Sequence, residues 1–360
     1  MEKLLKAREI INETDKEIAS LFEKRMEAVR LIAEYKQERG LPVFDGSREE
    51  AVIRNNLQHI ENEELKEFYV PFLRQTMEIS KRFQHRILEG ANIAYSGVEG
   101  AFAHIAAGRI FPDGNRISYP DFRSAYEAVE KGECDCAVLP IENSRAGEVG
   151  QVIDLLFSGS LYVNGMYSLD IRHNLIGLPG ATEADIKKVI SHEQALQQCA
   201  SYIKTQGYHA ESFENTARAA QFVADKGDIT LAAIASRETA ELYGLSVIRE
   251  NINEASDNTT KFIVVSRTLS TEKRDHSIIT FTVPDEAGAL AHAINVIGHH
   301  GYSMRSIRSR AMKDLMWTYY FYVELGGDLQ SRRGKYMLDE LSDCCDKLKM
   351  IGTFKDNCKI

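Results

Sequence analysis

The sequence predicts a multidomain fold in three parts: an all-α region, an α/β region and a small α+β domain of ferredoxin-like order. Glycine content separates the first part from the rest, because only Gly40 and Gly46 of the 24 glycines precede residue 90. Beyond residue 90, short apolar runs typical of strands alternate with helical patterns. Toward the end of the chain, the order of these runs is that of a split βαβ unit.

Long helices are expected in the first 89 residues. No Gly or Pro occurs from Leu4 to Arg39, and apolar residues recur three, four or seven positions apart, at Leu4, Ile11, Ile18, Leu21, Phe22, Val29 and Ile32. This spacing predicts one helix about 50 Å long, which is too long to fold back on a core of its own. A second helix is predicted over 48–60 and a third over 63–88.

Strands and helices alternate after residue 90. The predicted strands are 93–95, 136–141, 175–178, 188–190, 230–235 and 262–265. A polar stretch, 267–275, is interpreted as a linker. The strand, helix, strand, strand, helix, strand order that follows is predicted over 277–283, 289–299, 304–311, 317–325, 333–348 and 350–354.

Composition excludes several partners. The 360 residues carry 44 Lys+Arg against 53 Asp+Glu, a net charge of −9, which argues against nucleic acid. No apolar run approaches about 18 residues, and the start lacks a signal-peptide pattern, so we expect no membrane partner and a cytoplasmic location. The six cysteines lack zinc-ligand spacing, and no dinucleotide fingerprint is present. We therefore expect no metal and no cofactor.

The predicted helices carry charged residues that can share a face. Arg25 and Lys36 lie eleven positions apart, which places them within about 20° of each other around the helix. Arg8 lies about 100° away and about 25 Å along the axis, so a straight helix cannot bring it to the same small ligand. A second copy of the helix could place its own Arg8 at that ligand. Pattern alone also fits solvated surface, which is the usual place for charges on long helices.

The N-terminal residues 1–89 resemble the all-helical chorismate mutase family. The matching positions are the run Leu4–Arg8 with Asp15, Arg25, Lys36, Asp45, Arg48, Glu49, Ser80 and Gln84. The resemblance implies a long helix exchanged across a dimer, with Arg8 serving the partner's site. This agrees with the position of Arg8 on the helix.

Chorismate, the substrate that this resemblance implies, is a dianion that rearranges to prephenate through a pericyclic step. Such a reaction needs a fixed conformer and stabilisation of the ether oxygen as its bond breaks. The roles that the resemblance implies are Arg8 and Arg25 for the two carboxylates, Lys36 and Gln84 for the ether oxygen, Glu49 for the ring hydroxyl, and Asp45, Arg48 and Ser80 for orientation.

Residues 92–268 resemble the prephenate dehydratase family. The matching motifs are the glycine turn 95–102, the run 140–144 with Glu142-Asn143-Ser144, Ser191-His192 with 194–196, Ala235-Ser236, and Thr260-Lys261-Phe262. The resemblance implies two α/β lobes like those of periplasmic binding proteins, with substrate in the cleft between them. Two positions depart from the family pattern: Ala101 stands for a threonine and Lys261 for an arginine.

Dehydration of prephenate releases carbon dioxide and the ring hydroxyl, and forms phenylpyruvate. The resemblance assigns Thr260 to the leaving hydroxyl. A free alcohol is a poor acid, so Glu142 or a relayed proton is the alternative proton source. Asn143 and Ser144 are expected to bind a substrate carboxylate, and Lys261 is expected to contact substrate in place of the arginine.

Residues 276–360 resemble the ACT domain family, which binds amino acids. The resemblance rests on Gly288-Ala289-Leu290 and on Ser309-Arg310, whose neighbours Arg308 and Ala311 depart from the family's Glu-Ser-Arg-Pro. It implies that these five residues bind phenylalanine as an effector. The alternative is an ACT domain that serves only dimerisation.

All three resemblances together predict a bifunctional enzyme of phenylalanine biosynthesis under feedback control. Its expected domains are 1–89, 92–268 and 276–360, and its expected state is a homodimer or tetramer. Two alternatives stay open: a chorismate mutase whose dehydratase lobe is weakened, suggested by Ala101 and Lys261, and a non-catalytic sensor of amino acids or anions.

Overall fold

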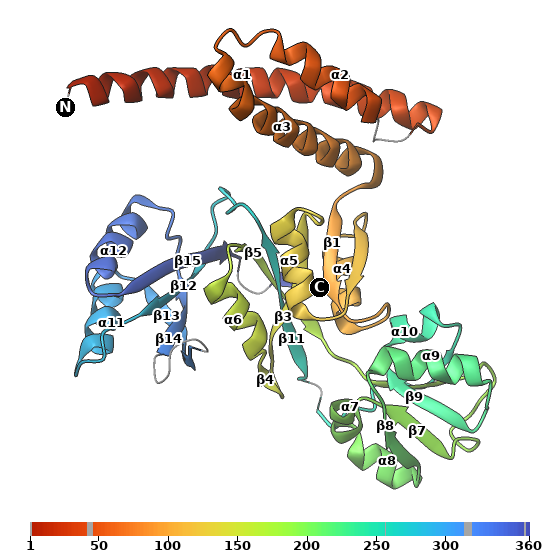
Figure 1. Cartoon of the computed structure of the whole chain (residues 1–360). Coiled ribbons are helices and arrows are strands. Elements are labelled where there is room, and N and C mark those ends of the chain that lie inside the picture. Colours follow the sequence, from red (N-terminus) through yellow and green to blue (C-terminus); the bar gives the residue numbers. More distant parts are fainter. Residues whose placement is uncertain (1, 42–45, 256, 313–318, 356–357) are drawn as a thin grey trace. The chain divides into compact units, whose positions relative to one another are not determined.

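The computed structural model describes residues 2–41, 46–255, 257–312, 319–355 and 358–360. The chain forms two compact units, which Figure 1 draws in one view. The helical unit comprises Met1–Ala91 with Asp113–Asn115, and the main unit comprises Asn92–Pro112 with Arg116–Ile360. Among the described residues, no helix is both long and apolar enough to pass through a lipid bilayer.

Three helices make up the helical unit, as predicted: α1 (Glu2–Arg39), α2 (Gly46–Leu57) and α3 (Glu63–Glu89). The Asn62 side chain caps the start of α3 by accepting a hydrogen bond from the Glu64 N–H at 3.0 Å. Gly90, with φ of +82°, follows its end. Both α1 and α2 contact α3.

Most apolar residues of α1 are exposed in this unit. Only Val29 and Ala33 of this helix are buried. Ten large apolar side chains along the helix are between 41% and 66% exposed, namely Leu4, Leu5, Ile10, Ile11, Ile18, Leu21, Phe22, Leu31, Ile32 and Tyr35. An apolar surface of this extent on one helix is typical of an interface with another chain.

Lobe 1 of the main unit is an α/β domain. Its elements are β1 (Asn92–Ser96), α4 (Phe102–Ile110), β2 (Asn115–Tyr119), α5 (Phe122–Lys131), β3 (Cys136–Asn143), β4 (Gly147–Glu148), α6 (Gly150–Ser158), β5 (Tyr162–Asp170) and β11 (Thr259–Ser266). The strands follow the order β5-β11-β3-β1-β2, with β4 beside β3. Strand β11, the last in sequence, therefore lies between β5 and β3.

Lobe 2 is built from the residues between β5 and β11. Its elements are β6 (Asn174–Gly177), β7 (Lys188–Ser191), α7 (Glu193–Gln198), α8 (Ala200–Gln206), β8 (His209–Ser212), α9 (Thr216–Lys226), β9 (Leu231–Ala235), α10 (Arg237–Leu242) and β10 (Ser246–Arg249). Its separate sheet has the order β10-β6-β9-β7-β8. The chain crosses between the lobes twice, after β5 and before β11 (Figure 1).

The C-terminal region, from residue 276 onward, has the predicted split βαβ order. It contains β12 (His276–Thr282), α11 (Ala289–His299), β13 (Ser303–Ala311), β14 (Tyr319–Gly326), α12 (Arg332–Asp343), β15 (Lys347–Phe354) and the short β16 (Cys358–Lys359). The sheet order β13-β14-β12-β15, with antiparallel neighbours, is ferredoxin-like. Trp317, predicted to begin the third strand, lies outside the described residues.

The last helix is shorter than predicted. Helix α12 ends at Asp343 instead of 348, because the chain from Lys347 onward pairs with β12. In the described part of the chain, the strands β2, β5, β8 and β10 were not predicted, nor were the two-residue β4 and β16. Strand β5 carries Asn164 and Gly165 near its start, which interrupt an apolar pattern, and its pairing with β11 determines its conformation instead.

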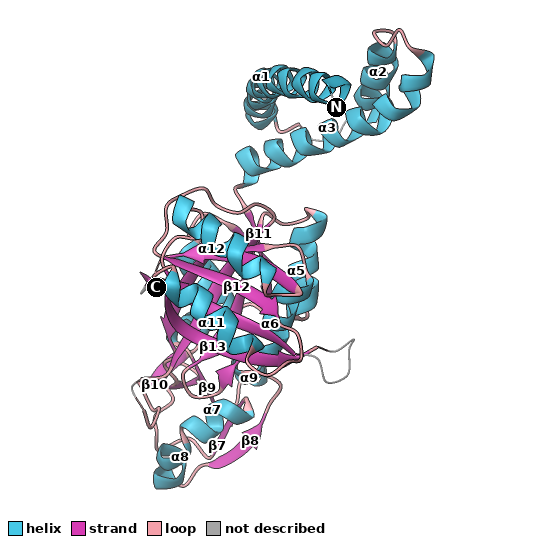
Figure 2. Cartoon of the chain, turned by 90° about the vertical axis from the view of Figure 1, so that its left-hand side faces the viewer, coloured by secondary structure: helices cyan, strands magenta, loops and turns pink. Residues whose placement is uncertain are grey.

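One continuous sheet joins lobe 1 to the C-terminal region. Strand β15 meets β5 in parallel at Gly352 and Val163. One face of the C-terminal sheet packs on α11 and α12, which Figure 2 shows beside β12 and β13. Residues of the other face, such as Ile278 and Tyr322, belong to the core of lobe 1. Strand β12, in the middle of this sheet, is therefore buried on both faces.

Gly352 makes this junction testable. A Cβ at this position would lie 2.0 Å from the Val163 carbonyl oxygen, so no side chain fits without backbone movement. Gly352→Ala should lower the free energy of unfolding by about 1–3 kcal/mol, measured by urea unfolding. Gly298→Ala is the matched control, because Gly298 lies in α11 and a Cβ added there would have no neighbour within 4 Å. Equal stability of the two variants would contradict the close junction.

Candidate active sites

Arg25 links the first and third helices of the helical unit. Its guanidinium donates to the Ser80 hydroxyl and, at 3.4 Å, to the Thr76 carbonyl oxygen. Burial lowers the pKa of Arg25. Ser80 and Gln84 are buried one turn apart on α3. The structure therefore brings Arg25, Ser80 and α3 together at one place.

Glu49 reaches the same helix through a lysine that the sequence analysis missed. Lys81 forms ion pairs with Glu49 at 2.9 Å and with Glu78 at 2.5 Å. Burial lowers the pKa of Lys81. The hydrogen bonds and negative charges of the two carboxylates raise it by more than burial lowers it, so the pKa lies above its ordinary value. The only sequence signal for Lys81 is its position between Ser80 and Gln84.

Gln84 carries a buried carbonyl oxygen that accepts no hydrogen bond among the described residues. A buried acceptor without a donor is costly, so Gln84 is a candidate contact for a ligand. Lys36 is half-buried, whereas Arg8 and Arg48 are exposed. Asp45 lies outside the described residues. Arg8 is seventeen positions before Arg25 on one continuous helix, about 25 Å away along its axis.

The cleft of the main unit is formed around two residues on paired strands. Asn143 ends β3, and Thr260 is its register partner on β11. The Asn143 amide donates to the Thr260 hydroxyl oxygen at 2.9 Å. Both residues line a cavity of about 320 Å³, together with His192 and Asn215 of lobe 2. Two residues predicted from separate motifs therefore share one site.

Backbone hydrogen bonds fix the orientation of Asn143. Its side-chain oxygen accepts from the N–H groups of Arg145 at 2.9 Å and Ala146 at 2.8 Å. The NH₂ group must therefore face Thr260, and an amide NH₂ can only donate. Thr260 accepts this bond, which leaves its own hydroxyl hydrogen available to a ligand in the cavity.

Ser144 differs from its predicted role. Its hydroxyl donates to the Asp257 carbonyl oxygen at 2.9 Å and accepts from the Thr259 N–H at 3.0 Å. These bonds join the end of β3 to the start of β11. In the structure, Ser144 therefore holds the two strands together, and a carboxylate would compete with backbone groups for it.

Glu142 and Lys261 point away from the cleft, contrary to the sequence expectation. They are register partners that adjoin Asn143 and Thr260, and strand residues alternate between faces. The Lys261 ammonium lies 3.1 Å from the Glu142 carboxylate, and the Arg308 guanidinium of β13 lies 2.9 Å from it. These residues line another cavity, of about 370 Å³.

The charge state of Glu142 also argues against its predicted role. Burial raises the pKa of Glu142. The charges and hydrogen bonds of Arg308 and Lys261 lower it by more than burial raises it, so the pKa lies below its ordinary value. Glu142 is thus an ionised partner of two cations. Thr260 and Glu142 line different cavities.

The predicted effector residues divide into two groups. Gly288, with φ of +89°, precedes α11, and the half-buried Ala289 and Leu290 form its first turn. On β13, Ser309 is exposed, but Arg310 faces lobe 1 and contacts Asp154 at 2.8 Å. Arg310 therefore joins the C-terminal region to lobe 1, which its neighbours in sequence could not reveal.

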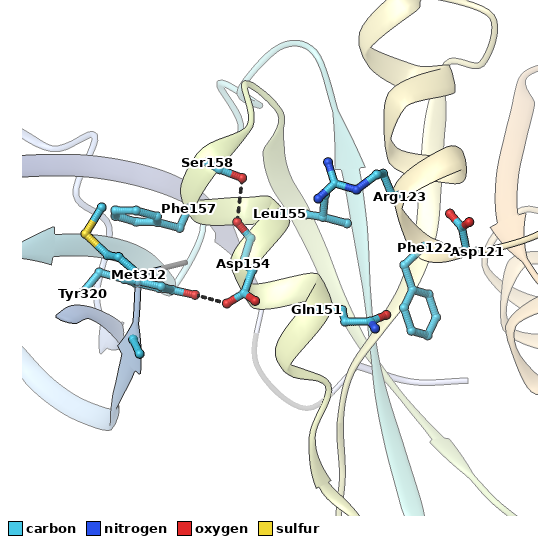
Figure 3. Close-up of a pocket in the computed structure, with 11 residues that line it drawn as sticks. Asp121, Phe122, Arg123, Gln151, Asp154, Leu155, Phe157, Ser158, Met312 and Tyr320 are labelled. Carbon is cyan, nitrogen blue, oxygen red and sulfur yellow. Dashed lines mark hydrogen bonds between the residues drawn. The ribbon is translucent and has the colours of Figure 1, made fainter. Parts of the chain in front are cut away.

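A larger cavity, of about 450 Å³, lies beside this contact. Figure 3 shows Asp154 of α6 at its centre, with the Tyr320 hydroxyl donating to the Asp154 carboxylate at 2.7 Å. The Phe157 ring stacks on Tyr320 with centroids 4.0 Å apart. Asn143 and Thr260 line the smaller cleft instead.

His173, Gln198 and Asn258 also line the cleft, and none of them was predicted as a site residue. Asn258 lies two residues before Thr260, but nothing in the sequence around it distinguished it from a turn residue. His173 and Gln198 gave no local signal, because their significance depends on contacts across the two lobe crossings.

A helical unit in which Arg25 and Glu49 contact α3, and a two-lobed unit with a cleft at Asn143 and Thr260, define a chain with two separate enzyme domains. Comparisons agree with this division. A family model described as Prephenate dehydratase matches residues 93–270, and one described as Chorismate mutase type II matches residues 7–85. The bifunctional chorismate mutase/prephenate dehydratase of Neisseria gonorrhoeae is 30% identical over 361 residues, covering 98% of this chain and 97% of the relative.

Solved structures match the main unit. Prephenate dehydratase from Arthrobacter aurescens, in complex with L-Phe, has a TM-score of 0.67 and 26% identity, and covers 73% of this chain and 89% of that one. GqqA, described as a novel type of quorum quenching acylase, has a TM-score of 0.68 and 29% identity, covering 73% and 97%. The chain belongs to the bifunctional chorismate mutase/prephenate dehydratase family, and it has the domains for both activities.

Proposed function

We propose that the chain converts chorismate to prephenate in the helical unit, and prephenate to phenylpyruvate in the cleft, on the way to phenylalanine in the cytoplasm. The proposed domains are 1–89, 92–268 and 276–360. The observation that carries the second activity is the Asn143–Thr260 pair, in which a buried hydroxyl keeps its hydrogen for a ligand. Retention of this pair favours an active dehydratase over a weakened lobe or a sensor.

In the mutase site, Arg25 and Arg8 bind the two carboxylates of chorismate. Lys36 and Gln84 stabilise the ether oxygen, where negative charge develops as its bond to the ring breaks. Glu49 binds the ring hydroxyl, and Asp45, Arg48 and Ser80 orient these groups. The Arg25–Ser80 contact and the buried Gln84 amide support this arrangement.

A second copy of the chain completes the mutase site. Arg8 is about 25 Å from Arg25 along α1, so it serves the site of the other subunit. The exposed apolar residues of α1 supply the surface for such a dimer. Whether dimers pair further into tetramers depends on contacts outside this helix.

In the dehydratase site, the Thr260 hydroxyl donates a hydrogen bond to the departing ring hydroxyl as carbon dioxide leaves. Asn143 strengthens this donor by donating to the Thr260 oxygen, because hydrogen bonds in a chain polarise one another. The position of Glu142 outside the cleft favours a relayed proton over direct transfer from this carboxyl. Ser144 and Lys261 support the site indirectly. Their contacts with Asp257 and Glu142 hold the end of β3 and the start of β11 together.

The C-terminal region acts as an ACT domain that binds phenylalanine and inhibits the enzyme. Gly288, Ala289, Leu290 and Ser309 are proposed effector contacts, and the L-Phe complex of the Arthrobacter aurescens relative supports the ligand. Arg310 connects this domain to lobe 1 through Asp154. Arg308 reaches Glu142, which adjoins Asn143 on β3. A change caused by phenylalanine would therefore reach the cleft through the contacts of Arg308 and Arg310.

Exchange of α1 predicts complementation between two inactive variants. Arg8→Ala and Lys36→Ala should each lose most mutase activity. Co-expression of the two should restore about a quarter of the wild-type rate, because half of random dimers are hybrids and each hybrid has one intact site. The measurement is chorismate consumption by the purified mixture. Activity no higher than the sum of the two variants would show that each site uses its own Arg8.

Thr260 variants separate the two activities. Thr260→Val keeps the side-chain shape but removes the hydroxyl, and should lower the dehydratase kcat by about 10²- to 10⁴-fold. Thr260→Ser restores a hydroxyl and should retain most of the rate. Mutase activity in the same preparations is the internal control and should not change. Equal loss of both activities in the valine variant would show that the sites are not separate.

A further inference from the structure

A chain of side-chain hydrogen bonds runs along the hinge between the two lobes. From Thr260 it passes to Asn143 at 2.9 Å, to Asn258 at 3.0 Å, to Gln198 at 2.8 Å and to His173 at 2.9 Å. All five residues line the cleft cavity. His173 is in the first lobe crossing, Asn258 is in the second, and Gln198 ends α7 of lobe 2.

Each link in this chain has a defined direction. The NH₂ group of Asn143 donates to the Asn258 oxygen, because backbone N–H groups occupy the Asn143 oxygen. Asn258 must then present its own NH₂ group to the oxygen of Gln198. The His173 Nε2 lies against the same Gln198 oxygen, so it must carry the hydrogen and donate.

The surroundings of His173 keep it in this form. The residue is 3% exposed, and its other ring nitrogen, Nδ1, is buried without a partner among the described residues. Burial lowers the pKa of His173 to about 4, against a smaller raising effect of Gln198, so the ring is neutral near pH 7. The Phe102 ring meets it edge-on at 5.8 Å between centroids. One tautomer is therefore fixed.

Backbone hydrogen bonds hold the two crossings together at the same point. The Ile171 N–H donates to the Asn258 carbonyl oxygen at 2.8 Å, and the Ile252 N–H donates to that of His173 at 2.9 Å. The Asn253 side chain bridges the crossings by accepting from the His173 N–H at 2.7 Å. Movement of one lobe relative to the other would therefore act on the side-chain network directly.

We propose that His173 is a positioning residue for dehydration, which acts through Gln198 and Asn258 to keep the Asn143 amide in place beside Thr260. The N–H groups of Arg145 and Ala146 determine which end of that amide donates, and the chain from His173 determines where the amide lies. His173 supplies the second donor that the Gln198 oxygen accepts, and so prevents this amide from turning over. A turned Gln198 would present NH₂ to the NH₂ of Asn258, and this conflict would pass along the chain. This inference rests on the proposed role of Thr260.

The test replaces His173 in the full-length protein. His173→Phe keeps a ring but removes the donor, and should lower the dehydratase kcat about tenfold with little change in the KM for prephenate, since the effect reaches the substrate through Thr260. His173→Gln keeps an N–H near the position of Nε2 and should recover most of the rate. Thermal unfolding of each variant, and its mutase rate, serve as controls for folding.

A double-mutant cycle shows whether His173 acts through the network. In an Asn258→Ala background the chain is already broken, so His173→Phe should cause no further loss of kcat. A full tenfold loss in that background, an unchanged kcat in the single variant, or a raised KM at constant kcat would each overturn the proposal. If Thr260→Val retains dehydration, the proposed function itself fails, whatever the His173 variants do.

Discussion

The insertion of β11 between β3 and β5 is the constraint on which the main unit depends. The chain leaves lobe 1 after β5, builds all of lobe 2, and returns to the middle of the first sheet. Its register with β3 sets Thr260 opposite Asn143 and Lys261 opposite Glu142. Because strand residues alternate between faces, one pair enters the cleft and the other faces the C-terminal region. A slip of one residue would separate Thr260 from Asn143 and Lys261 from Glu142.

This register also brings contacts from the C-terminal region and the cleft onto the same two strands. On one face, Glu142 forms ion pairs with Lys261 and Arg308. On the other face, its neighbour Asn143 donates a hydrogen bond to the Thr260 hydroxyl. Arg308 and Arg310 extend from β13 to lobe 1, and β15 continues the same sheet at Gly352. A change in the C-terminal region would therefore act on the strand ends that form the cleft, without crossing the lobe hinge.

The large-scale organisation could be predicted from the sequence alone. The gap in glycine use and the helical spacing predicted three helices, and the confirmed α11 was predicted at its observed bounds, Ala289–His299. The resemblance to the prephenate dehydratase family predicted Asn143 and Thr260 as site residues, and the structure places them opposite each other on paired strands. Local patterns failed for β5, whose Asn164 and Gly165 interrupt the apolar run, since pairing with β11 determines this strand.

The finer geometry depends on residues far apart in sequence. Glu142 was expected in the cleft because the motif shows adjacency but not which face of the strand each residue occupies. Arg310 was expected at an effector, but its partner Asp154 lies 156 residues away. Such contacts follow from topology, which local spacing does not encode.

The central claim is that one chain holds two separate and active sites. The most direct measurement supplies purified protein with chorismate and follows its loss together with prephenate and phenylpyruvate, with and without phenylalanine. The account predicts loss of chorismate, formation of phenylpyruvate and a lower rate of phenylpyruvate formation when phenylalanine is added. Accumulation of prephenate without phenylpyruvate would contradict it, because the Asn143–Thr260 site would then be present but inactive.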